Sequence, residues 1–146
     1  MQRQIVPDVV SEQTLVGLAP TASVLEAASM MRDRHIGAIL VMDQGKLLGI
    51  FTERDMVCRV VAERLDPETT VLRDVMTPDP DTLTPNQQAG EALEMMGRRG
   101  YRHLPVVRDG DVIGIVSVRD LFAAVRSELE EEVQTREAFM FDTGYG

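Results

Sequence analysis

A seven-residue stretch that occurs twice constrains this chain more than any other feature. Residues 49–55 read GIFTERD, and sixty-five residues later residues 114–120 read GIVSVRD. Each copy predicts an apolar strand that ends at a hydroxyl residue and leads into a helix, with a carboxylate three residues further on. Backbone N–H groups and the positive end of the helix dipole favour an anion at such a junction.

The repeat extends well beyond these two stretches. Residues 18–56 and 83–121 align without a gap, and 13 of the 39 paired positions are identical. In the first copy we expect a strand at about 14–18, a helix from Ser23 to about Arg34 and a hairpin over 38–51. In the second copy the same order predicts a strand near 82–83, a helix over about 87–97 and a hairpin over 103–117. Each hairpin leads into a further helix, so the sequence predicts two β-α-β-β-α halves and an α/β (α+β) fold.

Short lead-ins and a connector complete the expected domain organisation. Residues 5–10 resemble residues 71–76, one residue off the main spacing, so both halves are expected to begin with a similar lead-in. We therefore expect a first repeat with its lead-in at 1–65, a connector at 66–81, a second repeat at 82–127, and an acidic helix end with an aromatic tail at 128–146. The aromatic content of the tail favours docking on a partner subunit over a frayed end.

Composition excludes several classes of function. The net charge of −9 and the absence of a basic stripe argue against nucleic acid and against a membrane surface. No apolar run approaches the roughly 20 residues that cross a bilayer. The single Cys58 forms no internal disulfide, and the N-terminus lacks a signal-peptide pattern. We therefore expect a soluble cytoplasmic protein, with Cys58 in the core.

The pairs Thr52/Asp55 and Ser117/Asp120 allow two interpretations. A hydroxyl residue followed three positions later by a carboxylate is a capping box, which needs no ligand. The same groups, turned outward, could bind a ribose diol and a phosphate, with Arg54 or Arg119 neutralising the charge. Spacing alone favours the cap. Similarly, Arg98 and Arg99 could bind phosphate, but basic residues also favour the last turn of a helix.

With these motifs in view, the sequence resembles a tandem pair of CBS (cystathionine β-synthase) domains, also called a Bateman module. It specifically resembles the small stand-alone two-repeat proteins of bacteria and plant organelles. The resemblance covers nearly the whole chain. It is carried by the two seven-residue stretches, by DVMT at 74–77 and by RHLPVV at 102–107.

The resemblance implies two pseudo-twofold repeats packed sheet to sheet into one module, with adenosine ligands bound in two clefts between the repeats. The candidate ligands are AMP, ATP, NAD(H) and S-adenosylmethionine, as regulators of an energy or redox sensor and not as catalytic cofactors. Asp55 and Asp120 would hold ribose hydroxyls, Thr52 and Ser117 would reach the phosphate, and Arg54 and Arg119 would assist. The remaining candidate residues line the adenine slots or border the second cleft: Ile36, Gly37, Ala38, Tyr101, Arg102, His103, Leu104 and Pro105 for adenine, and Met76 and Thr77 for the border.

The two ligand sites are not expected to be equally occupied. Ala38 and Leu40 stand where the second copy has His103 and Pro105, although His103 could equally be a surface residue.

We expect that the protein is not an enzyme, because no Cys/His cluster has metal spacing and no nucleophile sits in a recognisable elbow. A homodimer, and a protein partner that the module regulates, are further expectations. The rival hypotheses are a structural module with empty clefts and a small nucleotide hydrolase.

Overall fold

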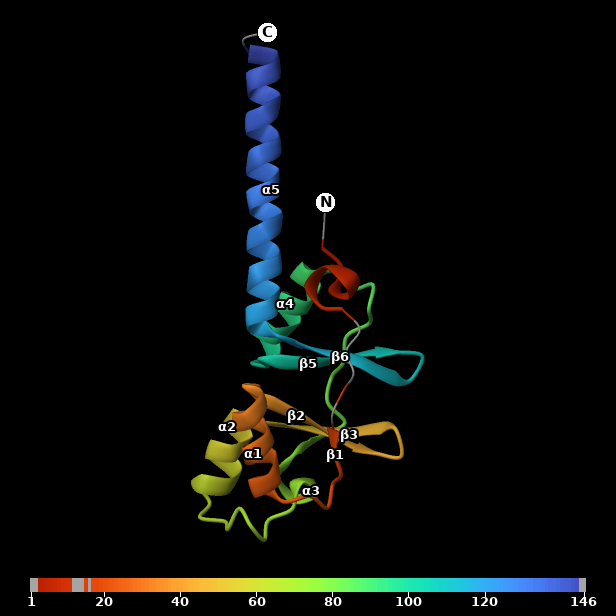
Figure 1. The fold of residues 1–146 in the computed structure, drawn as a ribbon, viewed down its shortest axis with the longest axis vertical. Coiled ribbons are helices and arrows are strands. Elements are labelled where there is room, and N and C mark those ends of the chain that lie inside the picture. The colour runs from red at the N-terminus through yellow and green to blue at the C-terminus, as the bar shows by residue number, and fades with distance from the viewer. Residues whose placement is uncertain (1–2, 12–14, 16, 145–146) are drawn as a thin grey trace. The chain divides into compact units, whose positions relative to one another are not determined.

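The chain folds into two compact units. The computed structural model describes residues 3–11, 15 and 17–144, with side chains as far as residue 140. One unit, here the first-copy unit, comprises the described parts of Gln13–Thr82 together with Val107–Ile113. The other, the second-copy unit, comprises the described parts of Met1–Glu12, Leu83–Val106 and Gly114–Gly146. Each unit thus contains the predicted helix that opens its copy of the repeat (Figure 1).

The first-copy unit is built on a four-stranded sheet in the order β1-β2-β3-β4. The strands are β1 (Gly17–Leu18), β2 (Ala38–Asp43), β3 (Lys46–Thr52) and β4 (Thr77–Pro78). β1 runs parallel to β2, whereas β2–β3 and β3–β4 are antiparallel. The helical segments are α1 (Val24–Arg34), α2 (Glu53–Asp55), η2 (Met56–Val61) and α3 (Leu72–Val75), and η2 continues directly from α2.

The core of this unit includes apolar positions of α1 that recur three and four residues apart. Val24, Ala27 and Met31 on one face of α1 are buried, and they cluster with Phe51 of β3 and other buried residues. The reciprocal hydrogen bonds between Ser23 and Glu26 form the capping box that the sequence predicts. β2 and β3 contain continuous apolar runs, which are typical of strands covered on both faces, and residues 38–41 and 49–51 are buried.

The second-copy unit repeats the order with a longer last helix. It contains η1 (Ile5–Val9), α4 (Ala89–Arg99) and α5 (Val118–Gly144), together with the larger parts of β5 (His103–Arg108) and β6 (Asp111–Ser117). The hairpin end of these two strands, Val107–Ile113, is assigned to the first-copy unit. β5 and β6 form a two-stranded sheet. The strand expected near 82–83 is present only as a single parallel bridge from Leu83 to Val106. The buried residues of α4 are Ala89, Ala92 and Met96, each sixty-five residues after its partner in α1.

Both hairpins turn at a two-residue pair that ends in glycine. Gln44 and Gly45 have φ angles of 50° and 78°, and Asp109 and Gly110 have φ angles of 51° and 85°. Positive φ at both central residues is typical of a two-residue turn whose twist matches that of the flanking strands. Each glycine adopts this conformation without the steric cost that a β-carbon brings.

The lead-ins attach to the opposite copies of the repeat. In the second-copy unit, the N–H of Ile5 donates to the Gln87 carbonyl (2.9 Å), and the N–H of Ala89 donates to the Arg3 carbonyl (2.8 Å). Arg3 also forms an ion pair with Glu131 of α5. The N-terminal lead-in, which we had grouped with the first repeat at 1–65, therefore packs in the second-copy unit.

The connector lead-in makes the equivalent bonds in the first-copy unit. The N–H of Leu72 donates to the Ala22 carbonyl (2.9 Å), and the N–H of Val24 donates to the Thr70 carbonyl (2.9 Å). Ala22 and Val24 lie sixty-five residues before Gln87 and Ala89, so these bonds match those of the N-terminal lead-in. Ile5 is thus equivalent to Leu72 and not, as the sequence alignment suggested, to Val71.

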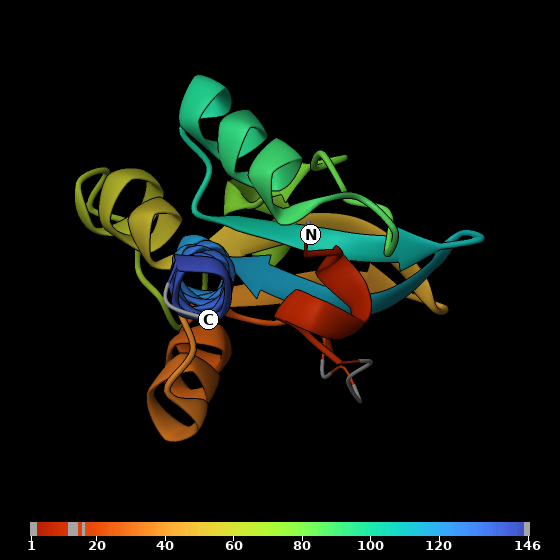
Figure 2. The ribbon, with the colours of Figure 1, turned by 90° about the horizontal axis from the view of Figure 1, so that it is seen from above.

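Helix α5 runs straight through the segment in which we expected a separate tail. Figure 1 shows it extending past α4 and η1 of its own unit, and Figure 2 looks along its axis. The side chains of residues 129–140 are all exposed. Glu, Gln, Arg and Ala are good helix formers, so the acidic run continues the helix. Tyr145 and Gly146 lie outside the described residues, and docking of the tail on a partner stays a prediction.

Candidate ligand-binding site

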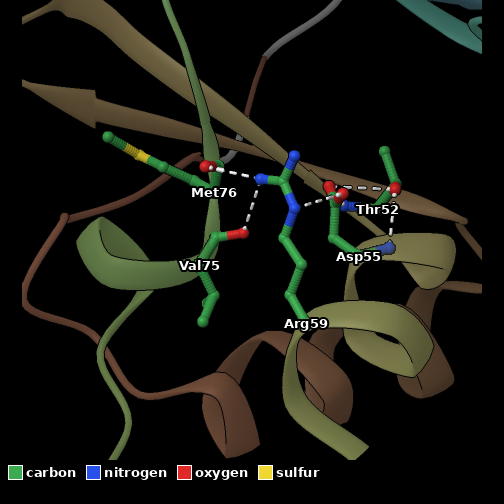
Figure 3. A network of polar contacts seen from close by, with 5 residues as sticks. All are labelled: Thr52, Asp55, Arg59, Val75 and Met76. Atoms are coloured by element: carbon green, nitrogen blue, oxygen red, sulfur yellow. Dashed lines mark hydrogen bonds and ion pairs between the residues drawn. The ribbon is translucent and has the colours of Figure 1, made fainter. Parts of the chain in front are cut away.

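The first hydroxyl–carboxylate pair lies at the junction of β3 and α2, as predicted. The backbone N–H and the Oγ1 hydroxyl of Thr52 donate to Oδ2 of Asp55, at 2.9 and 3.0 Å. In return, the backbone N–H of Asp55 donates to Thr52 Oγ1 at 3.2 Å (Figure 3). The capping-box interpretation of this pair is therefore confirmed.

The second pair has the same geometry at the junction of β6 and α5. The N–H of Ser117 donates to Oδ2 of Asp120 at 2.9 Å, and the N–H of Asp120 donates to Ser117 Oγ at 3.1 Å. Here the pair opens a helix of 27 residues. The N-terminal end of this helix adds a partial positive charge, which favours an anion next to Ser117.

In both pairs the cap uses only one carboxylate oxygen. Oδ2 accepts the capping hydrogen bonds, and Oδ1 of Asp55 lies 3.6 Å from Nε of Arg59, beyond hydrogen-bond distance. The Asp55 side chain is 13% exposed. A carboxylate oxygen can accept more than one hydrogen bond, so each cap leaves capacity for hydroxyl donors from a ligand. Capping and ligand binding are therefore compatible roles for the same residue.

The structure brings the predicted adenine-slot residues next to these pairs. In the first copy, Ala38 pairs with Thr52 across β2 and β3, and the Gly37 carbonyl accepts the N–H of Glu53 at 3.0 Å. In the second copy, the Arg102 carbonyl accepts the N–H of Val118 at 2.8 Å. The chain segment before each hairpin is thus hydrogen-bonded to the start of the helix that carries the carboxylate.

The predicted slot residues differ in how accessible they are. Ile36 is exposed, and Tyr101 and His103 are half-buried. Ala38, Leu104 and Pro105 are buried. Buried residues can shape a slot by packing, whereas the first three can also contact a ligand directly. Arg54 and Arg119, the expected phosphate assistants, are both exposed, as are Arg98 and Arg99 at the end of α4.

Met76 and Thr77 are joined to the first copy. Thr77 pairs with Ile50 of β3, and a β-carbon on Gly49 would lie 2.5 Å from the Met76 sulfur and 2.8 Å from the Thr77 carbonyl oxygen. Only a glycine allows so close an approach of β4 to β3. We expected both residues to border the second cleft, and that role stays a prediction. Within this unit, Thr77 pairs with β3, and the Met76 carbonyl accepts a hydrogen bond from Arg59, which lies beside Asp55.

Arg59 is the residue near this site that sequence reasoning missed. Its guanidinium lies between Asp55 and the carbonyls of Val75 and Met76 (Figure 3). The spacing of four residues from Asp55 was the available signal, because oppositely charged residues four apart face each other on a helix.

The expectation that Cys58 lies in the core is wrong, because its side chain is exposed. Val60 is buried and Met56 is half-buried, so these two residues take the inward face of η2. Cys58 lies midway between them and faces away from the core.

A comparison with protein families identifies the class of protein. The family model of the CBS domain matches residues 6–62 and again residues 72–127. The chain therefore belongs to the CBS domain family and contains two such domains in tandem. Proteins with this pair of domains are generally regulatory and non-catalytic modules.

Individual relatives agree with this assignment. The chain is 36% identical over 104 residues to the CBS domain-containing protein YhcV of Bacillus subtilis (strain 168), covering 71% of this chain and 74% of that protein. It is 32% identical over 130 residues to the uncharacterized protein MK0525 of Methanopyrus kandleri, covering 86% of this chain and 66% of that protein. Several other relatives are longer, and the chain spans only 18% to 21% of their length.

A solved structure shows the same fold. The CBS-domain containing protein ATU1752 from Agrobacterium tumefaciens is 31% identical to the chain and superimposes with a TM-score of 0.76. The match covers 82% of this chain and 98% of that one. Among the described residues, no helix is both long enough and apolar enough to span a membrane.

Proposed function

We propose that this chain is a non-catalytic regulatory module that binds an adenosine-containing ligand such as AMP, ATP, NAD(H) or S-adenosylmethionine. The observation that carries the proposal is the pair of matching junctions at Thr52/Asp55 and Ser117/Asp120. Each junction presents a carboxylate with acceptor capacity to spare at the start of a helix. A ribose diol needs such an acceptor, and a phosphate favours the helix N-terminus beside it.

The residues at each junction have distinct roles in this proposal. Asp55 and Asp120 accept the ribose hydroxyls, while Thr52 and Ser117 face the phosphate. Exposed Arg54 and Arg119 assist in neutralising the phosphate. The segments that precede β2 and β5 line the adenine. Binding of this kind would report the concentration of the ligand to a partner protein that the module regulates, as an energy or redox sensor does.

Thermal unfolding in the presence of candidate ligands tests the proposal. A ligand at about a hundred times its dissociation constant adds roughly 2.7 kcal/mol to the free energy of unfolding. We expect at least one of AMP, ATP, NAD(H) and S-adenosylmethionine, at millimolar concentration, to raise Tm by several degrees. Inorganic phosphate at the same concentration is the matched control. A phosphate-release assay on the same samples should show no turnover of AMP or ATP, whereas release would favour the hydrolase hypothesis.

One observation favours a second candidate function, a structural module with empty sites. Both capping boxes are complete without a ligand, so stability of the helix starts is sufficient reason for all four residues. If Tm stays constant with all four adenosine compounds, this structural function replaces the sensor.

We also propose that the module forms a homodimer. Val57 and Val61 of η2 and Phe122, Leu129 and Val133 of α5 are large apolar side chains that are each more than half exposed. Apolar surface on neighbouring turns of a helix is commonly covered by a partner. Sedimentation at micromolar concentration should give twice the mass of 16.2 kDa. A monomer mass at that concentration would contradict the proposal.

A further inference from the structure

Arg59 connects the carboxylate of the first site with the end of a short helix. Its Nη1 donates to the carbonyl oxygens of Val75 and Met76, at 3.1 and 2.9 Å. Its Nε lies 3.6 Å from Oδ1 of Asp55. The two carbonyls stand at the C-terminal end of α3, where the helix dipole favours a cation. Arg59 is therefore held in a defined orientation beside Asp55 (Figure 3).

This orientation leaves part of the guanidinium available. Among the described residues, Nη2 has no recorded hydrogen-bond partner, and the Arg59 side chain is 45% exposed. Nη2 carries two N–H donors. Because the protein already orders the side chain, a ligand that accepts these donors loses little side-chain entropy on binding.

The second copy has no equivalent cation. The residue four positions after Asp120 is Ala124, which is 8% exposed and packs in the core. The two sites therefore share their hydroxyl and carboxylate groups and differ in charge. The first contains a carboxylate paired with a guanidinium, and in the second the carboxylate has no such partner on the next helical turn.

We propose that Arg59 is a specificity-determining residue that makes the first site select anionic adenosine ligands over neutral ones. The inference rests on the proposed function and deepens it. An unpaired Asp55 would hold a ribose but repel the 5′-phosphate attached to it. Arg59 cancels that charge, and its Nη2 donors bind a phosphate oxygen. The phosphate of a ribose bound at Asp55 would lie within roughly one Debye length of the guanidinium, about 8 Å at physiological ionic strength.

The selection can be measured as a ratio of affinities. Calorimetry with AMP and with adenosine gives this ratio for each binding event of the full chain, and an Asp55→Asn variant identifies which event belongs to the first site. Arg59→Gln should weaken AMP at that event by roughly tenfold or more, because a charge-assisted bond is lost. Adenosine affinity should change less than about twofold, since adenosine has no phosphate to contact Arg59.

Two further variants separate charge from structure. Arg64→Gln removes the same charge from an exposed position just beyond η2 and should leave the ratio unchanged. Arg59→Lys keeps the charge but loses the planar fork, so it should restore part of the AMP preference.

The possible outcomes are distinct. A fall of the ratio with Arg59→Gln alone supports the inference. Equal losses for AMP and adenosine would show that Arg59 only holds α3 in place, and an unchanged AMP affinity would show that it has no role in binding; either result overturns the inference. If the unsubstituted chain binds neither AMP nor adenosine, the inference is overturned before any substitution is made. The proposed function itself fails only if ATP, NAD(H) and S-adenosylmethionine also leave Tm unchanged.

Discussion

Replacing Ile5 by alanine is expected to lower the free energy of unfolding of the second-copy unit by about 2–5 kcal/mol. Ile5 is 0% exposed, and its N–H is bonded to the Gln87 carbonyl ahead of α4. Truncating it removes buried methyl groups and leaves a cavity. The free energy of unfolding therefore falls both because less apolar surface is buried and because the cavity lacks packing contacts. Native-state hydrogen exchange should show reduced protection of amides in α4 and in the first turns of α5.

Leu72→Ala is the matched control for this prediction. Leu72 occupies the equivalent position in the connector lead-in, is also 0% exposed, and is bonded to the Ala22 carbonyl ahead of α1. Its truncation should cost a similar amount, with reduced protection of α1 and of β2–β3. If Ile5→Ala instead reduced protection around α1, the exchange of lead-ins between the two copies would be contradicted.

This exchange is the part of the fold that the sequence could not predict. The resemblance between residues 5–10 and residues 71–76 indicated two lead-ins, because local sequence encodes local structure. Which copy each lead-in packs against depends on contacts between residues that are distant in the chain, such as Ile5 with Gln87. No periodicity or capping pattern contains that information. For the same reason, the sequence alignment of the two lead-ins differs by one residue from the alignment that their hydrogen bonds define.

The regular elements were predictable because their signals are local. Apolar positions three and four apart fixed the buried face of α1, and Asp109-Gly110 fixed a hairpin turn. The strand expected near Leu83 was reduced to a single bridge, because a strand exists only through its pairing partners. The prediction that Cys58 lies in the core was wrong for a related reason. An apolar helical face suggested burial of Cys58, but Met56 and Val60 occupy the inward face of η2.

Much of the candidate site could be predicted, because the repeat marks its residues twice. Thr52/Asp55 and Ser117/Asp120 occupy the helix starts that their spacing indicated, with complete capping bonds. Arg59 has no counterpart in the second copy, so the repeat does not mark it. Its position near the site depends on hydrogen bonds to the carbonyls of Val75 and Met76, which are distant from it in the sequence.

The two carboxylates should contribute unequally to ligand binding, and Asp120→Asn is expected to have the larger effect. Asparagine keeps the volume and capping ability of the side chain but removes the charge that accepts two ribose hydroxyls. Charge-assisted hydrogen bonds contribute about 1.5–3 kcal/mol, so affinity at the second site should fall roughly tenfold or more. Calorimetry with the ligand that raises Tm most is the measurement.

Asp55→Asn is the matched comparison, with an expected smaller effect on the tightest binding event. The second copy alone has Arg102, His103 and Pro105 beside its carboxylate, which offer a cation, a hydrogen-bonding ring and a rigid strand start. In addition, Asp55 forms an ion pair with Arg59, which partly neutralises the carboxylate charge that a ribose diol would contact. Loss of the tight event with Asp55→Asn, and its survival with Asp120→Asn, would reverse the ranking of the sites. If both variants lowered only the free energy of unfolding, by the amount that a weakened cap costs, and left affinity unchanged, then the carboxylates would serve the helix starts alone.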